Sequence, residues 1–331
     1  VLFRSVYFDK ARSGRTVMNK RIRKSVKTLI KLKNNTELHY QRICHQAVLN
    51  LVKEQPESCL IGTAYDEQKA LPIITHKTTF DKTSIFYLNL FKMVLGNLFE
   101  QYEHIITSAN EAKKHISAVN GQTTVSIYYF NDSLARLGVM KDTSKAIQKK
   151  YLRRVRSNQK KMKKWAFHAP MNYLHRYDLV EAEKFRVLGK TKQAMVYYNK
   201  AIDGARENEY LQDEALANEM CGRFYLEMEQ KKVADVYLDE AFYLYDRWGA
   251  TAKVNDLKGK YPDIQNHKKH KRSSTLTDSP GSLTTSGTAS ELLDINSILK
   301  ASQTLSGEVQ FSRLLEKMMR ILIENAGAQK G

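Results

Sequence analysis

The residues of this chain that come closest to a catalytic motif form the run His-Arg-Tyr-Asp-Leu, from His175 to Leu179, in the stretch NYLHRYDLVEAE (172–183). Apart from its tyrosine, the run matches His-Arg-Asp-Leu, the loop whose aspartate accepts the proton of a substrate hydroxyl during phosphate transfer. The chemistry to test is therefore phosphoryl transfer with Asp178 as the base.

That chemistry needs other side chains at fixed distances from the aspartate. A lysine two residues after it and an asparagine five residues after it hold the transferring phosphate and a magnesium ion. The sequence has Val180 and Glu183 at these positions, and it lacks the glycine-rich loop, the Val-Ala-Ile-Lys strand, the Asp-Phe-Gly motif and the P-loop. We therefore expect Asp178 to have a structural role.

The structural alternative is a helix over 171–188 that neighbouring helices cover on two faces. One face carries Leu174, Asp178, Ala182, Phe185 and Leu188, and the other carries Tyr173, Tyr177, Val180 and Val187. Gly189 ends this helix, because a left-handed residue is needed there and glycine adopts that conformation freely.

No other group of side chains has catalytic or metal-ligand spacing. Cys44, Cys59 and Cys221 are far apart and odd in number, which fits a reducing cytoplasm. Glu181 and Glu183 fall on opposite sides of the helix, where neighbouring carboxylates are usually solvated. We expect no catalytic, cofactor-binding or metal-binding residue in this chain.

Positive charge is concentrated in three parts of the chain, whose formal net charge is +19. Lysine and arginine are frequent in 10–33, ten of them lie in Lys145–Lys164 without any Asp or Glu, and HKKHKR (267–272) is a third run. Such runs can hold phosphate backbones. No aromatic platform or known nucleic-acid motif accompanies them in the sequence, so solvated helix faces and linkers are the favoured interpretation.

The composition and the hydrophobic spacing favour an all-α fold. Hydrophobic residues make up 42% of the 331 positions, with only 15 Gly and 5 Pro, and strand-like alternation is nearly absent. The spacing predicts helices over 15–33, 36–54, 82–97, 99–118, 123–138, 142–166, 171–188, 191–207, 209–228, 231–247 and 249–258. The longest apolar runs, such as FYLNLF (86–91), are far too short to span a bilayer, and no signal segment opens the chain. These features favour a cytoplasmic protein without a membrane partner.

Composition divides the chain into four predicted regions. Region 1–35 is a basic N-terminal helix, which we expect to be truncated because the chain begins at Val1 without an initiator methionine. Region 36–262 is helical throughout. Region 263–290 is rich in Ser and Thr and predicts a flexible, disordered linker. Region 291–331 is apolar again but too short to complete a core, so it predicts the start of a second domain.

The helical region contains two similar hairpins about forty residues apart. The residues expected to pack within them are Leu188, Gly189, Ala194, Tyr198 and Ala201 in the first copy and Gly222, Tyr225, Ala234, Leu238 and Ala241 in the second. Small residues where paired helices approach, with a large one filling the gap, are similar to the tetratricopeptide repeat (TPR) and predict a helical-hairpin solenoid. Glu229 stands where the second copy would turn on glycine, so that turn is the weaker prediction.

Several longer stretches resemble the helical region of very large multi-sensor signal-transduction kinases. They are LIGTAYDEQKALP (60–72), NQKKMKKWAFHAPMNYLHRYDLVEAEKFRVLGK (158–190), ENEYLQDEALANEMCGRFYLE (207–227) and RWGATAKVNDLKGKYP (247–262). The segment 295–331 resembles the leading helices of a GAF sensor domain, an α/β fold that would be incomplete here. In this family a serine/threonine kinase-like domain and an ATPase-like module come first, and a histidine kinase often follows the GAF domain.

The resemblance implies that this chain is a non-catalytic interaction and relay region. ATP would be used by domains of the parent protein that lie outside this chain, so none of its catalytic residues is assigned here. The implied partners are other proteins or neighbouring domains, and a homodimer of the parent is one expectation, because helices leading into sensors often pair. The GAF ligand, the bound partner and the type of output kinase are left open.

Two alternatives to the relay remain open. One is a general scaffold protein. The other is nucleic-acid binding by the basic helix around Lys149–Lys164, with Trp165 as a stacking side chain. In the simpler interpretation of that helix, Tyr151, Val155 and Met162 face a core and the lysines face water, and a nucleic acid is not an expected partner.

Overall fold

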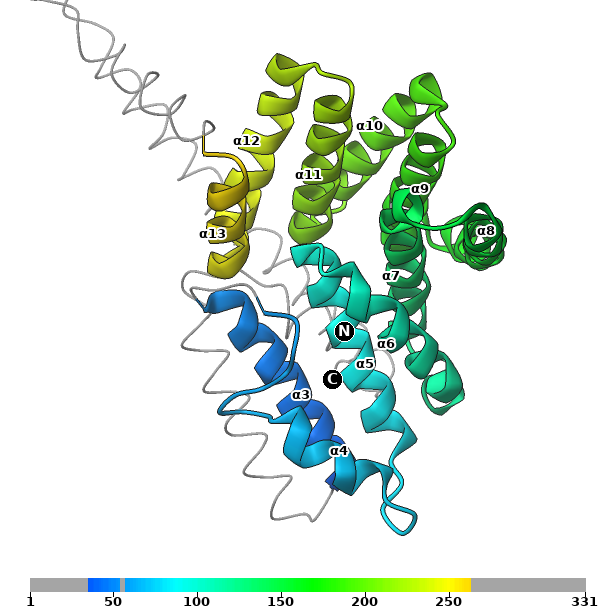
Figure 1. Ribbon diagram of the computed structural model, residues 1–331, viewed down its shortest axis with the longest axis vertical. Coiled ribbons are helices and arrows are strands. Elements are labelled where there is room, and N and C mark those ends of the chain that lie inside the picture. The colour runs from blue at the N-terminus through cyan, green and yellow to red at the C-terminus, as the bar shows by residue number, and fades with distance from the viewer. Residues whose placement is uncertain (1–34, 54–56, 263–331) are drawn as a thin grey trace, which may run out of the picture. The chain divides into compact units, whose positions relative to one another are not determined.

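The computed structural model describes residues 35–53 and 57–262, which form eleven α-helices and two short 3-10 helices and contain no strand (Figure 1). The α-helices are α3 (Asn35–Val52), α4 (Glu67–Thr75), α5 (Lys82–Phe99), α6 (Tyr102–His115), α7 (Thr124–Gly138), α8 (Lys145–His168), α9 (Pro170–Val187), α10 (Thr191–Glu207), α11 (Leu211–Glu227), α12 (Lys231–Trp248) and α13 (Thr251–Lys260). The all-α prediction is confirmed for this part of the chain.

Ten of the predicted helices coincide with observed ones to within a few residues, but α4 was not predicted. Pro72 lies inside α4, where it removes a backbone donor. The helix forms nevertheless because the Asp66 carboxylate accepts hydrogen bonds from the backbone N–H groups of Gln68 and Lys69, at 3.1 and 3.4 Å. Ala70 and Ile74 are its buried residues.

Helices α3, α4, α6 and α7 pack around the apolar helix α5. Asp81 caps the N-terminus of α5 by accepting a hydrogen bond from the Ser84 N–H at 3.0 Å. Phe86 of α5 and Tyr128 of α7 are fully buried and lie 6.2 Å apart between ring centroids. The Tyr128 hydroxyl donates to the carbonyl of Ala109 at 3.0 Å, which ties α7 to α6.

Helices α9 to α12 form two successive antiparallel hairpins, α9/α10 and α11/α12, that lie next to each other (Figure 1). The turn after each helix contains one residue with positive φ, namely Gly189 (69°), Glu209 (59°), Glu229 (59°) and Gly249 (82°). These residues are spaced by twenty positions. The backbone N–H of the next residue donates to a carbonyl five positions back in every case, as in Tyr210 to Ala205 and Gln230 to Tyr225, at 2.8 and 2.9 Å.

Helix α9 is covered on more sides than the two predicted faces require. Asp178 to Glu183 are all buried, and this includes both glutamates that the sequence led us to expect in water. The expectation for Glu181 and Glu183 is therefore wrong, and the reason is that each finds cationic and polar partners, described below. Leu174 and Leu188, by contrast, are exposed.

Helix α8 packs against α7 and α9. Val155, Met162 and Ala166 are buried, Tyr151 is partly buried, and the lysines face solvent. The predicted helix 15–33 and the predicted regions 263–290 and 291–331 lie outside the described residues, as does nearly all of 1–35. All described residues fall within one of the two units into which the chain divides.

Candidate functional site

The His175 side chain comes closest to a catalytic arrangement, because its Nε2 lies 2.9 Å from a carboxylate oxygen of Asp213. Arg176 donates to the same oxygen at 2.8 Å, and the Tyr210 ring stacks on His175 with centroids 4.5 Å apart. Burial lowers the pKa of His175, although Asp213 opposes the shift. His175 is only 2% exposed, so no substrate reaches it and the pair joins α9 to α11 instead.

Asp178, the residue tested as a kinase base, is buried on α9. Burial raises its pKa to about 6. The cation of Lys200 opposes that shift and Glu181 adds to it. Asp178 is therefore buried, and Val180 and Glu183 stand where phosphoryl transfer needs a lysine and an asparagine.

Glu181 and Glu183 each have a separate set of partners. Gln159 donates to Glu181 at 2.9 Å, and Lys184 forms an ion pair with it. Arg186 donates to Glu183 at 2.7 Å, and the Tyr198 hydroxyl also donates to it. The two carboxylates stabilise different contacts and do not converge on a reacting centre.

A second group of charged side chains joins the end of α5 to α11 and α13. Glu100, directly after α5, pairs with Arg223 of α11 and with Lys260 of α13, the latter at 2.7 Å. Burial alone would raise the pKa of Glu100, but Arg223 and Lys260 outweigh it and lower that pKa to about 2. Glu100 therefore stays ionised. Its two ion pairs connect it to α11 and α13, which lie more than a hundred residues later in the chain. We call Glu100, Arg223 and Lys260 the junction.

Further buried charges continue from the junction. Lys253 of α13 lies 2.7 Å from Glu219 of α11 and 2.9 Å from Asp256. The Tyr245 hydroxyl of α12 donates to Glu219 at 2.9 Å. Together these contacts connect α11, α12 and α13 through charged groups whose partners are fixed.

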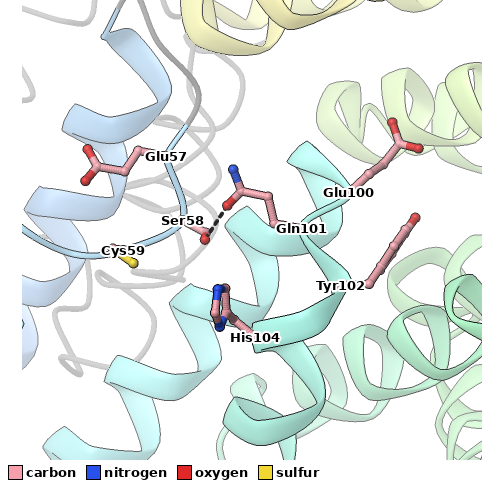
Figure 2. Close-up of a pocket in the computed structure, with 7 residues that line it drawn as sticks. All are labelled: Glu57, Ser58, Cys59, Glu100, Gln101, Tyr102 and His104. Atoms are coloured by element: carbon pink, nitrogen blue, oxygen red, sulfur yellow. Dashed lines mark hydrogen bonds between the residues drawn. The ribbon is translucent and has the colours of Figure 1, made fainter.

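A pocket of about 520 Å³ opens beside the junction (Figure 2). One wall comes from the segment before α4, with Glu57, Ser58 and Cys59, and the other from the turn between α5 and α6 and the first turn of α6, with Glu100, Gln101, Tyr102 and His104. Ser58 and Gln101 are hydrogen-bonded across it.

Cys59 is the one nucleophilic thiol in this pocket, and its surroundings do not activate it. Burial and the charge of Glu67 raise the pKa of Cys59, whereas a reactive thiol needs a lowered pKa. Among the described residues no group of three or more His, Cys, Asp or Glu side chains could hold a metal ion.

The ten residues proposed for repeat packing are found as follows. Ala194, Tyr198, Ala201, Gly222, Tyr225, Ala234, Leu238 and Ala241 are buried. Gly189 has a left-handed conformation, and Leu188 is 41% exposed because it follows the last helical residue of α9. The backbone of Gly222 approaches Leu238 so closely that a Cβ there would lie 2.6 Å from Leu238 Cγ.

The charged residues of the junction were not singled out from the sequence. Their partners lie far apart in the chain, so no spacing rule brings them together. No local signal marks Arg223 or Lys260 either, because α11 and α13 carry several other charged residues.

Comparisons with known proteins give one short match. A stretch of 62 residues is 40% identical to the "Hybrid signal transduction histidine kinase G" of Dictyostelium discoideum, which covers 19% of this chain and 2% of that protein. No family model and no solved structure matches the chain. Within the described ranges, no helix combines the length and the hydrophobicity that crossing a bilayer requires.

Proposed function

We propose that this chain is a non-catalytic interaction and relay region of a multidomain signal-transduction kinase. The carrying observation is the junction, in which Glu100 pairs with Arg223 and Lys260. The match to a signal-transduction histidine kinase supports the type of parent protein. Ion pairs between partly exposed side chains join α5 to α11 and α13, so that a displacement of α5 is transmitted to the two later helices, as a relay requires.

The hairpins support a TPR-like solenoid as the architecture of this relay. Each hairpin buries its small residues against its own partner helix, as Gly222 does against Leu238. Neighbouring hairpins then contact each other, and a bound partner can span several of them. Other proteins and neighbouring domains of the same polypeptide are the proposed partners, in the cytoplasm.

The rest of the parent protein follows from the family resemblance. The segment 291–331 begins a GAF sensor domain, the linker 263–290 precedes it, and ATP is bound by kinase and ATPase-like domains elsewhere in the polypeptide. We also propose that the parent protein forms a homodimer.

The test measures ligand-dependent phosphorylation by the full polypeptide. Arg223→Met removes one of the two cations that pair with Glu100, and we expect a several-fold loss of the ligand response while ATP binding is unchanged. Arg223→Lys should retain part of the response because it keeps the charge. Lys141→Ala, which removes an exposed ion pair with Glu227, is the matched control and should have no effect.

Two results would contradict the relay. One is an unchanged ligand response after deletion of 82–262. The other is ATP turnover by the purified 331-residue chain that is lost on substitution of Asp178 or His175. Unchanged phosphorylation together with capture of several partner proteins would instead favour the general scaffold.

A further inference from the structure

Helix α8 carries a continuous row of positive charge on the side that faces away from α7 and α9. We call this row the basic stripe; it consists of Lys145, Lys149, Arg153, Arg156, Lys160, Lys163 and Lys164, all exposed. The residues recur three or four positions apart, so they share one face over a length of about 28 Å. Arg154 points elsewhere and pairs with the buried Asp132 at 2.9 Å.

An aromatic pocket of about 450 Å³ is lined by Lys161 and Trp165 of α8, which follow Lys160 and Lys164 of the basic stripe directly in the chain. Its rings come from three helices, with Tyr129 on α7, Trp165 on α8 and Tyr173 on α9. Trp165 lies 5.8 Å from Tyr129 and 6.2 Å from Tyr173 between ring centroids. Lys161 lines the same pocket, with its ammonium 4.3 Å from the centre of the Tyr129 ring, and no acidic residue lines it.

This pocket supplies the aromatic platform that the sequence did not reveal. Tyr129 and Tyr173 are separated from Trp165 by 36 and 8 positions, and only the packing of α7, α8 and α9 brings the rings together. A cationic track together with clustered aromatic rings is a combination that binds single strands, because phosphates follow the charges while unpaired bases stack on the rings.

We propose that the basic stripe and the aromatic pocket together bind single-stranded nucleic acid. The phosphates lie along Lys149 to Lys164, and one base enters the pocket beside Trp165 and Lys161. Stacking tolerates any base, so the site has little sequence preference. A duplex would keep its bases paired and leave the pocket empty, and it would therefore bind more weakly. This activity is independent of the proposed relay.

The test is fluorescence anisotropy of the full chain with a labelled 20-nucleotide single strand and with the matching duplex. About five phosphate contacts give a log–log salt slope of about −3.5, so affinity should fall about 100-fold between 50 and 200 mM salt. Lys149→Glu/Arg153→Glu/Lys160→Glu should make the slope shallower. The matched control is Lys77→Glu/Lys192→Glu/Lys232→Glu, which changes three exposed lysines elsewhere and should leave most of the affinity; other basic runs are present in every variant.

The pocket is tested separately by Trp165→Ala and Tyr173→Ala, with circular dichroism and thermal melting to verify folding. Loss of one stacked base weakens single-strand binding about 5- to 150-fold and should bring it to the level of duplex binding. Tyr173→Phe keeps the ring and should keep the affinity.

Two outcomes would overturn the proposal. The first is the absence of single-strand binding at 50 mM salt. The second is binding to vesicles of phosphatidylcholine and phosphatidylserine that depends on the exposed Phe167 and Met171, combined with single-strand binding that Trp165→Ala does not change, since this would assign α8 to an anionic membrane surface.

Discussion

Lys253 and Glu219 form an ion pair in which the side chains are 0% and 1% exposed and Nζ lies 2.7 Å from Oε1. Lys253 also contacts Asp256, and Glu219 also accepts a hydrogen bond from Tyr245. The pair fixes α13 to α11. Its charges satisfy each other, and removing either one leaves the other in a medium that solvates it poorly.

Lys253→Met should therefore destabilise the protein by about 3–5 kcal/mol, because Glu219 loses its cation. The measurement is urea unfolding at pH 7. The double variant Glu219→Leu/Lys253→Met should lose less stability than the sum of the two single losses, since no charge is left unpaired. Lys141→Ala in the exposed pair with Glu227 should cost less than about 1 kcal/mol. An unchanged urea midpoint for Lys253→Met would refute this description of the core.

The turns at Glu209 and Glu229 should become more stable with glycine. Both glutamates have φ of 59°, a conformation that costs a residue with a Cβ about 1 kcal/mol or more, whereas glycine adopts it freely. Glu229→Gly should raise stability by a few tenths to about 1 kcal/mol in thermal unfolding. Gly189→Ala should lower stability by about 1 kcal/mol although nothing lies within 4 Å of the added methyl. Equal melting temperatures for the unchanged protein, Glu229→Gly and Gly189→Ala would contradict the left-handed conformation of these turns.

Asp178→Asn should stabilise the protein at pH 7. Burial raises the pKa of Asp178 from its usual 3.8 to about 6. Below pH 3.8 both folded and unfolded chains keep the proton, so the group has no effect; as pH rises toward 6 only the unfolded chain releases it, and stability falls. We expect a gain of about 1–3 kcal/mol at pH 7 and almost none at pH 3. A gain of the same size at both pH values would show that ionisation is not its cause.

Gly222→Ala should destabilise the α11/α12 hairpin. The added Cβ would lie 2.6 Å from Leu238 Cγ and 3.3 Å from the carbonyl oxygen of Ala234, so the helices must separate. The expected cost is about 1–3 kcal/mol. The double variant Gly222→Ala/Leu238→Ala makes room for the methyl group and should lose less stability than the sum of the two single variants. Purely additive losses would mean that the two helices do not meet at these residues.

Cys59 should be the first of the three cysteines to react with a thiol reagent. Burial raises the pKa of Cys44 and raises that of Cys221 to about 12, and both side chains are buried, whereas Cys59 is partly exposed in the pocket of Figure 2. At pH 7.5 one equivalent should react slowly, and in urea all three should react. Cys59→Ser should abolish the native reaction. Reaction of two or three thiols in the folded protein would contradict this burial.

The helices were predictable because their signals are local. The apolar spacing and the scarcity of glycine can be read within each helix, and the glycine that ends α9 lies directly after Leu188. Helix α4 has a weaker local signal, because it is short and contains Pro72, and the Asp66 cap stabilises its first turn. Glu229 is not a typical residue for such a turn, yet it has the left-handed conformation that glycine prefers between α11 and α12.

The buried charges and the aromatic pocket were not predictable by spacing. The pairs of Glu181 with Lys184 and of Glu183 with Arg186 are local, three positions apart on α9. The contacts that bury the two glutamates come from Gln159 of α8 and Tyr198 of α10, which no local spacing indicates. Glu100 and Arg223 are 123 positions apart, and Tyr129, Trp165 and Tyr173 come from three helices. Such contacts depend on how helices pack, which one sequence does not specify locally.

The twenty-residue spacing of the left-handed turns has a consequence for how the chain can change its length. Inserting one residue into a helix turns everything after it by about 100°, which would carry buried side chains such as Tyr198 or Leu238 toward water. Copying a whole forty-residue hairpin instead leaves each turn in phase with the next one. The fold of this region therefore tolerates the addition of a whole hairpin better than the insertion of a single residue into a helix.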